Sequence, residues 1–237
     1  MRPDTKQSYH FGVNFVFAPP PNLGAGVALR FQQLLAEPEV GLVFDQMQVQ
    51  KGPTGQPVGY TFVRQAPMLQ VTIGQPSPQV GQLLMVAPNP GRLVTDFVTD
   101  AEAVAQTFRQ CWPGPIQVVR RDCTIRNLYE VNAGHAFQFL WAQRLRQPEE
   151  AVQAFGRPIL GGGLRFVMPP RSDVPNDCTL EVKVESLLAD PRKLFVETQA
   201  VWEAPLPPGS EPNPRELIEE VGEYADHQVV DFITQGS

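Results

Sequence analysis

The chain has 237 residues, of which 42% are hydrophobic, and a formal net charge of −6 at pH 7. This length and apolar content suffice for one large or two small domains with a hydrophobic core, and no apolar run approaches membrane-spanning length. The odd number and wide spacing of Cys111, Cys123 and Cys178 favour reduced thiols and a cytoplasmic location. The negative charge disfavours nucleic acid and anionic membranes as general partners.

Residues 1–115 are predicted to form a β-α-β(4)-α half. Alternating aromatic and aliphatic residues from Tyr9 to Phe17 indicate a half-buried strand, and a helical stripe follows between Asn22 and Leu35. Thr99 and Glu102 have the spacing of a capping box, so a helix is expected to begin there and to end before Pro113. Between the two helices, Pro/Gly turns separate four strands expected at 42–50, 58–64, 68–73 and 83–87.

Residues 116–237 are predicted to repeat this order as a β-α-α-β(3)-α half. The clearest strand is Cys178 to Ser186, where apolar side chains alternate with charged ones. We therefore predict an α+β protein of two tandem halves, packed as one unit, with curved antiparallel sheets backed by helices. This order is similar to the TATA-binding-protein-like and helix-grip folds. The other elements expected are a strand at 116–128, helices at 133–146, 148–156 and 213–232, and strands at 164–168 and 194–202.

No catalytic, cofactor-binding or metal-binding residue is predicted. Gly24-Ala-Gly26 is followed by Asp45 at a dinucleotide-like distance, but Leu29 occupies the position of the third glycine. The three histidines show no metal-ligand spacing. Cys123 and His135 are candidates for a thiol and its base only if the strand and the next helix bring them together; a structural role for both is favoured.

Two surfaces are candidates for binding. Arginines concentrate in the middle of the chain, and they form either an anion-binding patch or an ion-paired interface with the acidic last helix; the interface use is favoured. Neutral polar side chains alternate on two strands of the first half and predict an uncharged docking face. The arginine patch comprises Arg120, Arg121, Arg126, Arg144 and Arg146, and the docking face comprises Gln46, Gln48, Gln50, Gln70 and Thr72.

Three stretches carry a resemblance to a known family. They are Arg121–Asn132, the strand Leu164–Pro169 and the pattern Glu216–Thr234, which ends Asp-Phe-Ile-Thr. Together with the order of elements, they resemble a sporadically distributed family of uncharacterised bacterial proteins, in which Gly-Leu-Arg-Tyr-Ile-Asn typically stands where this chain has Thr-Ile-Arg-Asn-Leu-Tyr from Thr124. The resemblance implies no established activity, and no site residue is carried over from it.

Three functions therefore remain open. The first is a non-enzymatic interaction or regulatory protein without a cofactor, whose partner is another protein or a second copy of this chain. The second is a small-molecule binder that holds an apolar ligand between a curved sheet and the C-terminal helix. The third, disfavoured by the net charge, is a local contact of the arginine-rich surface with nucleic acid.

Overall fold

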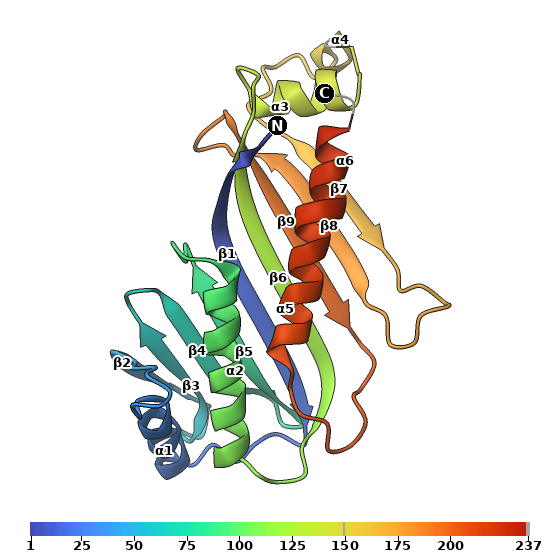
Figure 1. Cartoon of the computed structure of the whole chain (residues 1–237). Helices are drawn as coiled ribbons and strands as arrows, with labels where there is room; N and C mark the ends of the chain where they lie inside the picture. The colour runs from blue at the N-terminus through green and yellow to red at the C-terminus, as the bar shows by residue number, and fades with distance from the viewer. Residues whose placement is uncertain (149, 236–237) are drawn as a thin grey trace.

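Nine strands form one continuous antiparallel sheet in the computed structural model, which describes residues 1–148 and 150–235 (Figure 1). The strand order is β2-β3-β4-β5-β1-β6-β9-β8-β7. The strands are β1 (Arg2–Ala18), β2 (Gln46–Lys51), β3 (Pro57–Arg64), β4 (Leu69–Ser77), β5 (Val80–Pro88), β6 (Gln117–Glu130), β7 (Gly163–Met168), β8 (Thr179–Ser186) and β9 (Lys193–Trp202).

The α+β class and the curved antiparallel arrangement are confirmed, but the expected separate sheets are joined into one. The joint is the pairing of β1 with β6, which runs from Arg2 opposite Glu130 to Ala18 opposite Gln117. Strand β1 is longer than expected, because it includes the polar start of the chain, where no strand was predicted. The core therefore crosses the boundary expected at residue 115.

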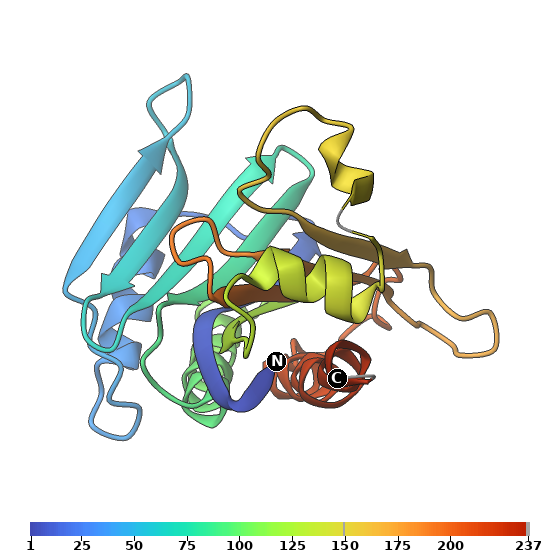
Figure 2. The ribbon, with the colours of Figure 1, turned by 90° about the horizontal axis from the view of Figure 1, so that it is seen from above.

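The helices α2 and α5–α6 lie side by side on one face of the sheet (Figures 1 and 2). We call residues 214–234 the C-terminal helix, because α5, a π-helical segment η2 and α6 follow one another without a break. Within the described residues, no helix is both long and apolar enough to cross a lipid bilayer. The helical segments are α1 (Ala25–Leu35), α2 (Val94–Cys111), α3 (Ala136–Gln138), the π-helical η1 (Phe139–Arg144), α4 (Glu150–Gln153), α5 (Pro214–Tyr224), η2 (Ala225–Val229) and α6 (Val230–Thr234).

Aromatic side chains of β1 form the centre of the core. Because side chains alternate across a strand, Phe11, Val13, Phe15 and Phe17 all face the helices, and all are buried. Phe11 stacks on Phe97 of α2, with 5.5 Å between the ring centroids. The aromatic alternation seen in the sequence is thus the feature that attaches the sheet to its helical layer.

Several predicted boundaries are wrong. Helix α2 begins at Val94 rather than near Thr99, because the Asp96 carboxylate accepts a hydrogen bond from the Leu93 N–H and caps the helix earlier. The expected loop between β4 and β5 is only a short hairpin turn, since Ser77 pairs with Val80. Its glycines belong to the strands.

The helices predicted in the second half also differ from those observed. The helix expected at 133–146 consists of the short α3 and the π-helical η1. The following helix was expected from 148 to 156, but it extends only over Glu150–Gln153 among the described residues. Glu149, which falls within the helix expected at 148–156, lies outside the described residues.

Candidate functional site

The C-terminal helix forms one wall of a long groove. Its start is fixed by Asn213, whose side chain accepts a hydrogen bond from the Glu216 N–H at 3.3 Å, and by Pro214 at the first helical position. Helical spacing then turns one apolar stripe toward the sheet. The stripe consists of Leu217, Ile218, Val221, Ala225, Val229 and Ile233, all of which are buried. The polar face of the helix stays in solvent.

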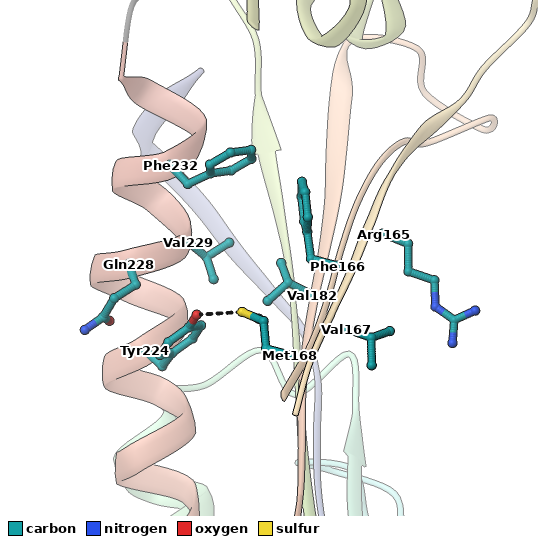
Figure 3. Close-up of a pocket in the computed structure, with 9 residues that line it drawn as sticks. All are labelled: Arg165, Phe166, Val167, Met168, Val182, Tyr224, Gln228, Val229 and Phe232. Carbon is teal, nitrogen blue, oxygen red and sulfur yellow. Dashed lines mark hydrogen bonds between the residues drawn. The ribbon is translucent and has the colours of Figure 1, made fainter. Parts of the chain in front are cut away.

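The opposite wall is provided by β7, the last strand of the sheet, and by its neighbour β8. Side chains from both walls enclose an apolar cavity of about 430 Å³ (Figure 3). Figure 3 shows Phe166, Met168 and Val182 directed toward the helix, whereas Arg165 and Val167 point to the other side of the strand. The lining residues are Arg165, Phe166, Val167, Met168, Val182, Tyr224, Gln228, Val229 and Phe232.

Specific contacts hold this apolar end in shape. The Tyr224 hydroxyl donates a hydrogen bond to the Met168 sulfur at 3.5 Å, which links the helix to β7. The rings of Phe166 and Phe232 meet edge to face, with 5.2 Å between centroids. Arg144 supports the end of the helix, because its Nε donates to the Phe232 carbonyl at 2.6 Å and its guanidinium lies 4.2 Å from the Phe232 ring centroid. Contacts of Phe166, Tyr224 and Phe232 thus connect the two walls of the cavity.

The groove continues along the helix and becomes polar. A middle section of about 320 Å³ shares Met168, Tyr224 and Gln228 with the apolar end. A polar section of about 540 Å³ shares Arg171, Asp177 and Glu220 with the middle. We call the three sections together the helix groove.

The polar end contains a buried arginine with one unsatisfied donor. Arg121 of β6 is only 8% exposed, and its guanidinium lies 5.6 Å from the Trp202 ring centroid. Within the described residues, Nε of Arg121 has no hydrogen-bond partner, and no side chain forms an ion pair with this arginine. Burial lowers the pKa of Arg121, and the nearby Glu216 and Glu220 oppose that shift. A buried donor without an acceptor is costly, so this atom is a destabilising feature of the free protein.

No family model matches the sequence, and a search of curated proteins finds no match either. The apolar rings of the helix groove suit apolar groups, while its polar end offers one free guanidinium and several carboxylates.

The predicted arginine patch is divided between surfaces. Strand alternation sends Arg120 and Arg126 to the face without helices and Arg121 to the helical face. Arg126 forms an ion pair with Glu197 at 2.5 Å, and Arg120 lies 3.7 Å from Glu203. The other two members lie elsewhere: Arg144 under the end of the C-terminal helix, and Arg146 just beyond η1 with a positive φ of 53°. The five side chains therefore do not share one surface.

The predicted docking face lies at the other end of the sheet. Gln46, Gln48 and Gln50 are exposed on the edge strand β2. Gln70 is half-buried and Thr72 is buried. Both lie on β4, which β3 separates from β2. The Thr72 hydroxyl lies 3.1 Å from that of Thr61, within hydrogen-bond distance. The exposed polar surface there is thus the glutamine row of β2.

The thiol candidate is buried too deeply to act as a nucleophile. Cys123 is 1% exposed on the helical face of β6, and burial raises its pKa, which disfavours the reactive thiolate. His135 instead caps α3, where its Nδ1 accepts a hydrogen bond from the Phe137 N–H at 3.0 Å. No cluster of potential metal ligands occurs within the part of the chain that the structure describes.

Proposed function

We propose that this protein is a non-enzymatic interaction or regulatory protein and that its partner binds in the helix groove. The single observation that carries this proposal is the apolar cavity of about 430 Å³ between β7 and the C-terminal helix. Aromatic side chains in partly open apolar depressions are the typical centres of binding energy at interfaces. Phe166, Tyr224 and Phe232 provide such a centre at the edge of the sheet.

An apolar small molecule is the second candidate occupant. The volume of the apolar end supports it, because ligand cavities commonly enclose about 300–1,000 Å³. Both candidates use the same walls and both predict that an apolar group becomes buried between Phe166 and the C-terminal helix. They differ because a partner protein would also occupy the middle and polar sections of the groove, whereas a small molecule would occupy the apolar end alone.

We also infer that the fold is a tandem duplication with a TATA-binding-protein-like order. The strand order supports this inference: outward from the centre, the first half contributes β1, β5, β4, β3 and β2, and the second contributes β6, β9, β8 and β7. In each half the helix after the last strand covers the sheet. Superposition of residues 1–115 on 116–237 with α2 on the C-terminal helix tests it; unrelated chain paths would contradict it.

A methyl NMR titration tests the proposed site directly. The chain has five methionines, and Met168 alone among them lines the groove. With ¹³C-methyl methionine and the neutral apolar dye Nile red, we expect saturable binding that shifts the Met168 methyl signal and leaves the signal of the core residue Met85 unchanged. No saturable binding, or a response that excludes Met168, would refute the groove as a binding site.

A pair of matched variants provides the control. Phe166 is 37% exposed on one edge strand, and Val49 is 43% exposed on the opposite edge strand, outside the groove. Phe166→Asp places a charge in the apolar end and is expected to weaken dye binding at least about tenfold, because an unpaired charge must be desolvated there. Val49→Asp is expected to leave dye binding unchanged.

A further inference from the structure

The free edge of β7 lies beside the apolar end of the groove. Strand β7 is last in the sheet order, so its outer side has no partner strand in the described part of the chain. Its Leu164, Phe166 and Met168 alternate with Arg165 and Val167. A strand added to this edge would gain main-chain hydrogen bonds and would place every second side chain in the apolar cavity. This geometry favours an extended chain over a compact molecule.

The polar end presents the guanidinium of Arg121 beside several carboxylates. The guanidinium of Arg121 lines this end, and its Nε is buried and unpaired. A main-chain carbonyl or an uncharged side-chain oxygen suits the part of this guanidinium that lines the groove. A carboxylate is less suitable, because Glu216 and Glu220 also act on this arginine and would repel an added negative charge.

The charge of the polar end favours a basic side chain. Asp177, Glu211, Glu216 and Glu220 line it together with two arginines. Asp177 is already bound by Arg171, since its Oδ2 accepts hydrogen bonds from the Arg171 N–H at 2.7 Å and from Nε at 2.9 Å. Glu211, Glu216 and Glu220 therefore line the polar end with Arg121, and two of them, Glu216 and Glu220, act on its guanidinium. The complementary group is a lysine or arginine.

The length of the groove agrees with a short peptide. Glu216 and Phe232 lie at its two ends and are separated by sixteen positions, which is roughly 24 Å along a helix. An extended chain advances by about 3.3 Å per residue, so roughly seven residues would span the groove. Apolar residues at one end of such a segment and a basic residue at the other match the two ends of the groove.

We propose that the helix groove receives an extended peptide segment of a partner protein that pairs with the free edge of β7, places alternate apolar side chains in the apolar cavity beside Phe166, and places a basic side chain among Glu211, Glu216 and Glu220. This proposal rests on the proposed function and names the partner class. Antiparallel pairing is the commoner arrangement in sheets. Because β7 runs toward the polar end, the basic residue is then N-terminal to the apolar ones.

Peptide display on the full chain tests the proposal. Random peptides of about eight residues, displayed on phage, are selected on the wild-type protein. We expect enriched sequences with apolar residues at alternate positions and a lysine or arginine at one end. The best sequence, made synthetically, should shift the Met168 methyl signal. It should bind Phe166→Asp at least about tenfold more weakly and Val49→Asp equally well.

A charge cycle tests the polar end separately. The double variant Glu216→Gln with Glu220→Gln is expected to weaken binding of the basic peptide about tenfold. Its effect on the same peptide with norleucine in place of the basic residue should be small. Equal losses for both peptides would show that the carboxylates do not read the basic group and would overturn that part of the proposal.

Failure of this proposal is distinguishable from failure of the proposed function. If Nile red shifts the Met168 methyl signal but no peptide pattern is enriched, the groove binds small apolar molecules and the peptide proposal is wrong. The proposal is equally wrong if enriched peptides lack the alternation or leave Met168 unchanged. If neither dye nor peptide reaches Met168, the groove is not a binding site.

Discussion

Replacing Arg121 with methionine is expected to stabilise the free protein. Arg121 is 8% exposed, its Nε has no acceptor among the described residues, and burial lowers its pKa although Glu216 and Glu220 lie nearby. A lowered arginine pKa means that the folded state disfavours the charge relative to water. Removing an unsatisfied buried donor gains about 1–3 kcal/mol. Loss of the contact with Trp202 costs about 0.5–2 kcal/mol.

The balance is a gain of about 1 kcal/mol in the free energy of unfolding, because methionine keeps most of the side-chain volume. For a chain of this size the midpoint of thermal unfolding should rise by about 2–4 °C. Urea and thermal unfolding followed by circular dichroism measure both quantities. The matched variant Arg171→Met should change stability in the opposite direction, since Arg171 has a partner in Asp177. If Arg121→Met instead loses more than about 1 kcal/mol, the guanidinium is already satisfied in the free protein.

Three further predictions concern buried titratable groups. Burial and the charge of Arg126 lower the pKa of His10 to about 4, although Glu197 acts in the opposite direction. The free energy of unfolding therefore falls as pH drops from 6.5 toward 4. Urea titrations at both pH values should show that His10→Gln reduces this loss, by about 3 kcal/mol at most. An unchanged pH dependence would contradict this. Glu197 accepts hydrogen bonds from Arg126 at 2.5 Å and Lys183 at 2.6 Å. Burial alone would raise the pKa of Glu197, but these hydrogen bonds lower it below the usual 4.5. Glu197→Gln should therefore lower the free energy of unfolding by about 2–3 kcal/mol at pH 7, and by less as pH falls below 4.5. Equal stabilities at pH 7 would count against this network. The thiol of Cys123 should react with a disulfide reagent only at the rate of global unfolding, and fast labelling of the native protein would show that it is accessible.

Alternation was the most informative sequence signal. It correctly predicted strand structure over Tyr9–Phe17 and the two strands observed as β8 and β9, and a helix was correctly expected near 213–232. It was insufficient for the start of β1, which is polar and joins the sheet irregularly, with Arg2 opposite Glu130 and Gln7 opposite Leu128. Long-range pairing of this kind leaves no local signal.

Turn signals were less reliable than alternation. Gly81 was assigned to a loop, but it lies in β5 against the proline segment after β1, where a Cβ would come within 2.2 Å of the Pro21 ring. The glycine is needed for close approach rather than for a turn. A sequence alone does not distinguish these two uses, because the contacting prolines are distant along the chain.

The site was anticipated by location and not by residue. A cavity between the sheet and the C-terminal helix was one of the open alternatives, whereas its lining from Phe166, Met168 and Tyr224 was missed. The signal for Arg121 was present but was grouped incorrectly with Arg120. Consecutive strand residues point to opposite faces, so these two arginines had to be separated once β6 was accepted as a strand.

The groove exists because the second half covers its sheet less completely than the first. In the first half, α1 packs beside α2 and against β3, so that the outer strands are covered. In the second half, α3 and α4 lie at the end of the sheet (Figure 1), and the C-terminal helix packs against β6 and β9. The apolar face of β7 is therefore incompletely covered, with Phe166 37% exposed, whereas Val182 and Val184 of β8 are buried. An uncovered apolar edge is a liability in a protein that binds nothing, which makes an occupant the simplest physical reason for its persistence.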